Sequence, residues 1–244
     1  MTSPDSAEQA AARPAGEHHH DHRDVTGGWL RPAVFGFTDG LISNASLISG
    51  VAGAGVHAHA VILTGLAGLV AGAFSMATGE YVSVASQTEL TRAEIEIEKS
   101  ELKRVPQAEE AELAAIYVGR GVDPATANEV ARQLSRDPEQ AWRAHAREEL
   151  GVDPDDLPSP WTAAGSSFAS FGLGAMVPLL PYLLGSTSLL VAVLLSGVSL
   201  FVAGAAVSRF TNRSALYSGA RQLILGALAA GMTYAVGAAV GTGV

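Results

Sequence analysis

Two acidic side chains, Asp39 and Glu80, stand inside apolar stretches of this 244-residue sequence, which contains 24 acidic residues in all. A carboxylate at membrane depth is costly, and such residues usually mark the path of an ion or a proton. Met76 lies four residues before Glu80, so the two share one face of a helix. The sequence therefore predicts a transport path. The structural alternatives are a hydrogen bond between helices for Asp39, apolar packing for Met76 and a half-solvated place at the membrane interface for Glu80.

A second group of potential metal ligands lies in the polar middle of the chain. Glu98 follows Glu80 by 18 residues, or five helical turns, and therefore returns to nearly the same face. Carboxylate oxygens with one imidazole suit Fe(II) or Mn(II). For any single glutamate the alternative is a solvated helix face, but two later pairs repeat the one-face spacing. The spacing thus singles out Glu98, flanked by Glu94 and Glu101, and the pairs Glu109/Glu112 and His145/Glu149.

Five apolar stretches provide the frame, and each is long enough to cross ~30 Å of hydrocarbon as a helix. They lie near residues 33–56, 60–86, 162–184, 187–210 and 216–241. All 15 Lys and Arg fall in the N-terminal segment, the polar middle or one short loop region. If the helices alternate in direction, these three places lie on the same side, as the positive-inside rule requires. We therefore expect an all-α membrane protein with five transmembrane helices.

The second apolar stretch has no proline until Pro106, so a single helix can extend from it to about Arg104. Asp123–Pro124 and Asp137–Pro138 each combine a helix cap with a proline at the first helical position. We expect the last helix of this region to end at Gly151. The predicted organisation is a disordered histidine-containing tail (1–28), transmembrane helices 1 and 2 (29–86), a cytoplasmic acidic metal-binding domain (87–160) and transmembrane helices 3 to 5 (161–244).

The composition limits the kinds of partner that the protein can bind. The formal net charge is −9, and residues 87–160 hold 17 acidic and 9 basic side chains, so this region suits cations and disfavours nucleic acid. The chain has no cysteine, which excludes thiolate metal sites. It also shows no nucleotide-binding loop, no nucleophile–base pair and, outside the N-terminal tail, no Glu-x-x-His pair, so we expect neither an enzyme nor a prosthetic group.

The N-terminal tail carries a compact group of histidines. His18, His19, His20 and His22 surround Asp21 and offer donor atoms for a metal ion. A solvated histidine-rich tail without a defined site is the alternative.

Several runs of the sequence carry a resemblance to a known family. They are DGLISNASLISGVAGA, GAFSMATGEYVSVASQ, VPQAEEAEL, AHAREELG and GAMVPLLPY, in this order along the chain. With them, the chain from about Phe35 onward resembles the vacuolar iron transporter family, in a bacterial-type form. The resemblance implies five membrane helices per protomer, a homodimer with the path between protomers, and a cytoplasmic helical metal-binding domain. It also implies export of Fe(II) from the cytoplasm in exchange for protons.

The same resemblance assigns the site residues. Asp39, Met76 and Glu80 would line the membrane path. The predicted metal ligands in the cytoplasm would be Glu98, Glu101, Glu109, Glu112, His145 and Glu149. His145 stands where the family can carry methionine, and an imidazole also suits Zn(II). We expect an integral protein of the plasma membrane with a cytoplasmic N-terminus. The alternatives are a Mn(II) exporter of the same mechanism and a non-transporting metal sensor or storage protein that would not need Asp39.

Overall fold

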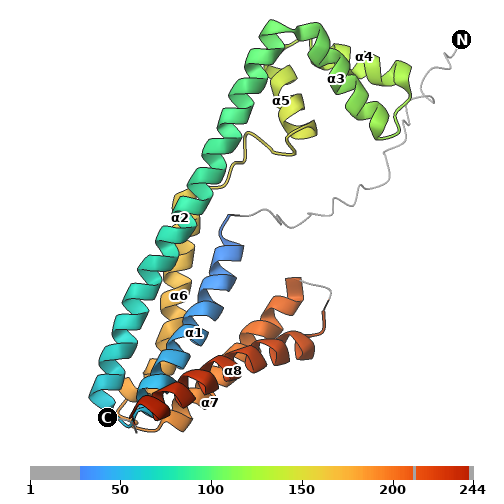
Figure 1. Ribbon diagram of the computed structural model, residues 1–244. Coiled ribbons are helices and arrows are strands. Elements are labelled where there is room, and N and C mark those ends of the chain that lie inside the picture. The colour runs from blue at the N-terminus through green and yellow to red at the C-terminus, as the bar shows by residue number, and fades with distance from the viewer. Residues whose placement is uncertain (1–27, 211–212, 242–244) are drawn as a thin grey trace, which may run out of the picture.

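The computed structural model describes residues 28–210 and 213–241, and these residues form helices and connecting turns without any β-strand. Figure 1 shows their arrangement. The all-helical prediction is therefore confirmed for the described residues. The tail with His18 to His22 lies outside them. The elements are α1 (Leu30–Gly53), α2 (Ala58–Arg104), α3 (Pro106–Gly119), α4 (Pro124–Leu134), α5 (Pro138–Glu148), α6 (Pro160–Leu183), α7 (Leu189–Val207), the 3₁₀ helix η1 (Ser208–Phe210) and α8 (Ala215–Gly241).

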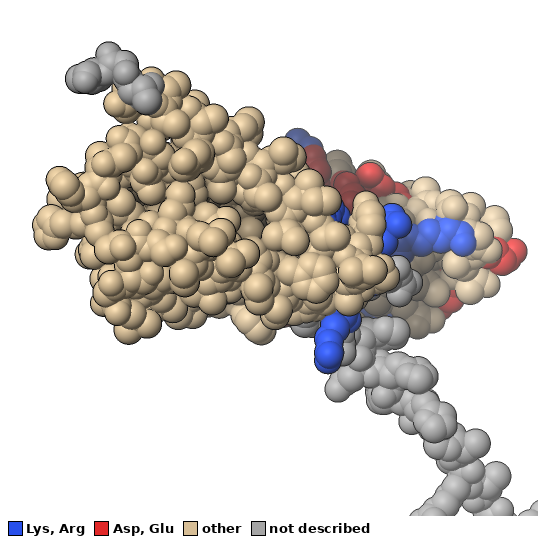
Figure 2. Space-filling view, turned by 90° about the horizontal axis from the view of Figure 1, so that it is seen from below, with Lys and Arg blue, Asp and Glu red and all other residues tan. Residues whose placement is uncertain are grey.

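Four of these helices are long and apolar enough to cross a membrane, namely α2, α6, α7 and α8. Seen from the end opposite α3 to α5, the bundle presents a broad surface on which no Lys, Arg, Asp or Glu is visible (Figure 2). Charged side chains come into view only beyond it. The prediction that the chain spans a membrane is thus confirmed. The predicted number of five spans is not, because α1 is not one of these four helices.

Helix α1 packs against α6, α8 and α2 and carries many buried residues. Its contact with α6 depends on glycine at two crossing points. A Cβ atom at Gly40 would collide with the carbonyl oxygen of Phe171, and one at Gly174 would collide with that of Phe37. Close backbone contact of this kind is typical of helices that associate in lipid. It fixes α1, and with it Asp39, against α6.

Helix α2 is a single helix of 47 residues, as predicted. At 1.5 Å per residue it is about 70 Å long, more than twice the thickness of the hydrocarbon layer. Its far end runs out of the bundle and meets α3 and α5, and α4 packs against these two helices (Figure 1). We call the outer part of α2 (residues 87–104) together with residues 105–159 the polar insert.

The predicted helix starts in the polar insert are confirmed. The Asp123 carboxylate accepts hydrogen bonds from the amides of Ala125 and Thr126 at the start of α4, and Asp137 caps α5 in the same way. The predicted end of α5 at Gly151 is wrong, because the helix ends at Glu148. Gly151 instead adopts a φ of 67°, a left-handed conformation that glycine tolerates and that turns the chain away.

Candidate metal centre

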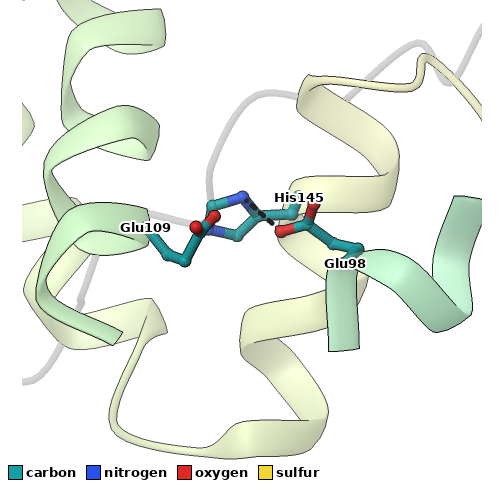
Figure 3. Close-up of side chains that lie close together, drawn as sticks. All are labelled: Glu98, Glu109 and His145. Carbon is teal, nitrogen blue, oxygen red and sulfur yellow. Dashed lines mark ion pairs between the residues drawn. The ribbon is translucent and has the colours of Figure 1, made fainter. Parts of the chain in front are cut away.

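Three side chains from three helices converge in the polar insert. Glu98 from α2, Glu109 from α3 and His145 from α5 each offer one ligand atom, and these atoms lie within 4.8 Å of one another (Figure 3). No other set of three His, Asp or Glu side chains in the described part of the chain meets this condition. All three are buried, and His145 is 0% exposed. We call them the buried trio.

The surrounding helices explain why the buried trio is held together. Leu113 and Ala114 of α3 pack against Ala131 of α4 in a small apolar cluster, which Ala144 of α5 also contacts. The Arg120 guanidinium donates a hydrogen bond to a carboxylate oxygen of Glu148, which joins the end of α3 to the end of α5. This apolar packing and this ion pair hold α3 and α5 together, and with them Glu109 and His145.

The polar atoms of the buried trio are not satisfied by one another. Glu98 Oε1 lies 2.9 Å from His145 Nδ1, which is an ion-pair distance. Yet this oxygen and both ring nitrogens lack a hydrogen-bond partner among the described residues, so the approach does not have hydrogen-bond geometry. When the imidazole is neutral with its proton on Nε2, two lone pairs face each other. A cation or a proton between them would remove the cost of leaving buried polar atoms unpaired.

The electrostatics of the trio favour a bound cation. Burial raises the pKa of Glu98 from 4.5 to about 7, and the four other predicted glutamates add to the shift. Burial also raises the pKa of Glu109, with Glu112 as the next cause, while His145 acts in the opposite direction. The protein thus disfavours bare carboxylates here, and a divalent ion would offset both the burial and the mutual repulsion.

The other three predicted ligands, Glu101, Glu112 and Glu149, lie near the buried trio and are more exposed. Glu149 Oε2 lies 3.5 Å from His145 Nδ1. Glu101 and Glu112 lie close enough to influence the pKa of Glu98, and Glu101 also pairs with Arg104 at 3.3 Å. The structure therefore gathers all six predicted residues in one region but divides them into three buried and three more exposed side chains. Their role as ligands stays a prediction.

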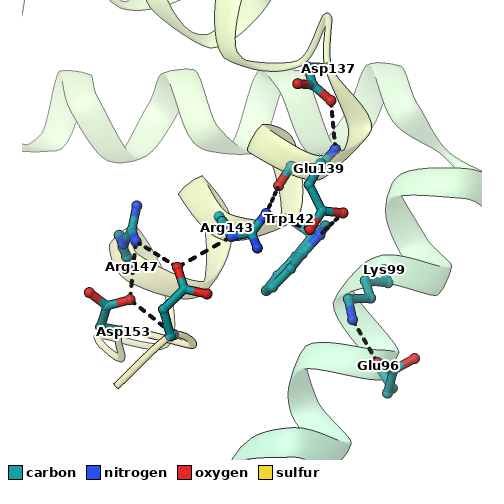
Figure 4. Close-up of polar contacts among 9 residues, drawn as sticks. Glu96, Lys99, Asp137, Glu139, Trp142, Arg143, Arg147 and Asp153 are labelled. Carbon is teal, nitrogen blue, oxygen red and sulfur yellow. Dashed lines mark hydrogen bonds and ion pairs between the residues drawn. The ribbon is translucent and has the colours of Figure 1, made fainter. Parts of the chain in front are cut away.

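A second layer of contacts fixes α5 against α2, and the sequence analysis missed it. The Trp142 indole N–H donates to Glu139 at 3.0 Å, and Lys99 Nζ lies 4.4 Å from the centre of its ring (Figure 4). Arg147 donates to Asp153 at 3.1 Å and ties the helix to the linker that follows it. The only signal in the sequence was the position of Trp142, three residues before His145 on the same helix.

The predicted path residues lie in the membrane bundle and do not join the buried trio. Asp39 is partly buried, and the Ser43 hydroxyl donates to its Oδ1 at 3.2 Å. Met76 packs against the cluster of Ala73, Phe171 and Ala175, which fits the packing alternative as well as the path.

The depths of Asp39 and Glu80 differ. Asp39 lies about 21 Å from the end of α1, and Glu80 about 33 Å from the start of α2, at 1.5 Å per residue. The two helices are antiparallel neighbours, since Gly68 faces Asn44. Glu80 therefore lies about 12 Å nearer to the polar insert than Asp39. The next residue, Tyr81, has its ring 4.7 Å from that of Trp161 in the first turn of α6.

The described chain combines a helical membrane bundle, an acidic insert and a buried set of two carboxylates and one imidazole. This combination is typical of a membrane protein that binds metal ions. Comparison with known proteins gives the family: residues 30–238 match the VIT family, and the chain belongs to it. This assignment confirms the resemblance found in the sequence.

Curated relatives extend over most of the chain. It is 41% identical to a "Vacuolar iron transporter" of Acanthamoeba castellanii over 87% of this chain and 78% of the relative. It is 34% identical to "Vacuolar iron transporter 1" of Oryza sativa subsp. japonica, over 97% of this chain and 94% of the relative. A protein of the same name from Arabidopsis thaliana is 31% identical over 89% and 88% of the two chains. These names describe transporters, so the family is one of transporters and not of enzymes.

Proposed function

We propose that this protein exports Fe(II) from the cytoplasm in exchange for protons, with Mn(II) as the closest alternative substrate. The observation that carries the proposal is the continuity of α2. One helix bears Glu98 of the buried trio at its outer end and Met76 and Glu80 inside the bundle. The trio would collect the ion, and the bundle would conduct it.

Iron is the substrate in the proposal for two reasons. The relatives in amoeba and plants are named iron transporters. The buried trio also offers two carboxylates and one imidazole, a donor set that suits Fe(II), Mn(II) and Zn(II) and lacks the thiolates that favour Cu(I).

The proposed topology has five membrane helices with α1 as the first. Helix α1 has 24 residues and extends about 36 Å, which is long enough to cross the hydrocarbon layer. Because α6, α8 and α2 surround it, its small and polar residues need not face lipid. Trp29 and Trp161 stand exposed near the starts of α1 and α6, where an aromatic belt would lie. The polar insert is then cytoplasmic.

The proposed assembly is a homodimer with the path between its protomers. Leu90 and Ile97 lie seven residues apart on one face of α2, and they are 62% and 51% exposed in the part of the helix outside the bundle. Large apolar side chains in water call for a partner surface, and a second α2 would supply it. Among the described residues Asp39 belongs to no group of three potential metal ligands, and a path between protomers would add ligands from the partner.

The proposal of proton exchange rests on the free-energy cost of an ionised carboxylate in the low-dielectric interior of the membrane. Between metal loads, Asp39 or Glu80 would take up a proton, and an arriving ion would displace it. Outward movement of metal would then be coupled to inward movement of protons.

The relatives are named for a vacuole, so they give no support to the expected plasma-membrane location of this chain. Fractionation of cells that express a tagged protein at native level would identify the membrane.

Proteoliposomes provide the central test. We expect uptake of Fe(II) and Mn(II) into vesicles by molecules whose polar insert faces outward, accelerated by an acidic lumen. Glu80→Gln cannot exchange a proton and should weaken that acceleration, whereas Gln87→Ala on the same helix should not. Metal flux without any response to the pH gradient would replace antiport with a uniporter. Metal binding without flux would favour the sensor or storage alternative.

A further inference from the structure

The last part of the chain carries an unbalanced positive charge. Residues 157–244 contain three arginines and no acidic residue, and the arginines lie together where α7 is followed by α8. Arg209 belongs to η1, Arg213 lies two residues before α8, and Arg221 is the seventh residue of α8. All three are exposed. Arg213 and Arg221 form no ion pair with a described acidic side chain, so their charge is left to a partner outside the chain or to solvent.

The arginines lie at the end of the bundle where α1 begins. Helix α8 runs parallel to α1, because the Thr233 hydroxyl donates to the Ser46 carbonyl oxygen and, one turn further on, Gly237 packs against Gly50. The start of α8 is therefore level with the first turn of α1. Arg221 lies six residues, or about 9 Å, further along α8. This position is inside the apolar span but within reach of the headgroup layer.

Arg221 belongs to the face of α8 that is directed away from the bundle. Tyr217, Arg221, Ile224 and Leu228 follow one another at spacings of four, three and four residues, which places them on one face. Tyr217 is 56% exposed and Ile224 is 58% exposed, whereas the buried residues of α8 lie on the other side. A charged group on a lipid-facing stripe is costly unless its long side chain extends back to the membrane surface. Arg221 is therefore expected to meet lipid headgroups.

Arg213 approaches the same face from outside the helix. Its guanidinium carbon lies 5.9 Å from the centre of the Tyr217 ring, a distance at which a cation is attracted by an aromatic face. Tyr217 in turn precedes Arg221 by one helical turn. Guanidinium groups present N–H donors in a fork that matches a phosphate group. Two guanidinium groups and an interfacial tyrosine thus gather at the depth of a lipid phosphate.

Charge and shape together identify the kind of ligand. Positive charge without acidic neighbours attracts an anionic headgroup and repels the ammonium group of a zwitterionic one. Arg209 adds to this charge, since η1 contacts α8. Below Arg221 the exposed stripe continues with Ile224 and Leu228, which offer an apolar surface to an acyl chain. A free phosphate ion would leave that surface unused, so the features favour a lipid.

We propose that Arg213, Tyr217 and Arg221 bind the headgroup of an anionic phospholipid, whose acyl chain lies along Ile224 and Leu228. The site is separate from the buried trio and does not depend on which ion the protein moves. It requires only that α8 spans the membrane. Since α8 packs against α1 and α7, a bound lipid stabilises the end of the bundle at which α1 begins.

The test titrates the full-length protein in detergent with single lipids and measures the dissociation constant of the first bound lipid by native mass spectrometry. Phosphatidylglycerol is compared with phosphatidylcholine of the same acyl chains, and glycerol 3-phosphate serves as a competitor that has the phosphate but no chain. The variant is Arg213→Gln with Arg221→Gln. The matched control is Arg132→Gln with Arg136→Gln, which removes the same charge from exposed positions in the polar insert.

We expect the wild type to prefer phosphatidylglycerol about 25-fold, or about fivefold for each arginine, and the variant to lose this preference. The control should follow the wild type. If the double variant does not fold, as circular dichroism would show, Arg213→Gln and Arg221→Gln are measured singly, each with an expected fivefold loss. An equal preference in variant and wild type would overturn the proposal, as would a wild type that does not distinguish the two lipids. Displacement of the lipid by an equal concentration of glycerol 3-phosphate would show that the site binds phosphate and not lipid.

Discussion

The polar insert and the membrane bundle place their acidic side chains in different ways. In the insert, Glu98 and Glu109 are buried beside His145 within a single chain. In the bundle, Asp39 is partly buried with Ser43 as its hydrogen-bond donor, and Glu80 lies about 12 Å nearer to the insert. Among the described residues, the insert thus brings three potential ligands together, whereas the membrane helices hold no group of three His, Asp or Glu side chains this close. Binding of metal and its movement across the membrane should thus be separable by mutation.

The largest effect should come from Asp39→Ala, which removes the acidic group that lies deeper in the bundle. We expect metal flux in proteoliposomes to fall at least a hundredfold, about 3 kcal/mol in the barrier, while the buried trio binds metal as before. Ser43→Ala is the control, because it removes only the hydroxyl that donates to Asp39. Flux at the wild-type rate in the Asp39 variant would show that the path does not include this residue.

The next effect concerns the packing that holds α1 in place. Gly174→Ala should prevent close contact between α1 and α6, because the added methyl group meets the Phe37 carbonyl. A backbone shift of this kind costs on the order of 1–3 kcal/mol. We expect a lower unfolding temperature in detergent and reduced flux. Gly172→Ala, two residues earlier on the same helix, meets nothing within 4 Å and should be neutral or slightly stabilising. Equal stability of the two variants would contradict the packing argument.

The contrast between the two regions also separates what the sequence could predict from what it could not. Helix starts at Asp123–Pro124 and Asp137–Pro138 were predictable because capping is a local interaction. The single helix α2 was predictable because no proline interrupts it. One-face spacing, together with the family resemblance, likewise pointed to the six potential ligands of the insert.

The division of those six residues was not predictable, because it depends on how α3 and α5 cross α2. Glu98 and Glu101 are both helical glutamates on neighbouring faces, yet only Glu98 is buried beside His145. The contact between Lys99 and Trp142 that positions α5 joins residues far apart in the sequence, and no spacing rule gives it. The depth of Glu80 relative to Asp39 required the antiparallel packing of α1 and α2, which brings Gly68 to Asn44.

A smaller effect should distinguish the metal centre from a diffuse acidic surface. Replacement of Glu109 and Glu112 together by glutamine should lower metal affinity ten- to a hundredfold, about 1.4–2.8 kcal/mol, because Glu109 is a buried predicted ligand and Glu112 adds negative charge beside it. Glu94 and Glu96, changed in the same way, remove the same charge from an exposed face and should have little effect. Calorimetry with Mn(II) on the full-length protein measures both. Equal losses in the two variants would favour a diffuse acidic surface.

A further effect is the pH dependence of the candidate metal centre. The pKa of Glu98 is raised from 4.5 to about 7, so the metal-free folded state holds this proton more tightly than the unfolded state does. The resulting stability is fully present below pH 4.5 and is lost as the pH rises through 7, by an amount on the order of 3 kcal/mol. The metal-free insert should therefore resist urea better at pH 5 than at pH 8. Glu98→Gln should remove most of this difference.

The same proton governs metal affinity, with the opposite sign. Below pH 7 an arriving ion must displace the proton from Glu98, so affinity should fall about fivefold between pH 7 and pH 6 and level off above about pH 8. Calorimetry in two buffers of different ionisation enthalpy counts the released protons directly. Glu98→Gln should bind metal more weakly at pH 7.5 but with a flatter pH dependence and fewer protons released. If the variant keeps the wild-type slope, the proton that competes with metal resides on another side chain, and the assembled centre does not depend on Glu98 in the way its burial indicates.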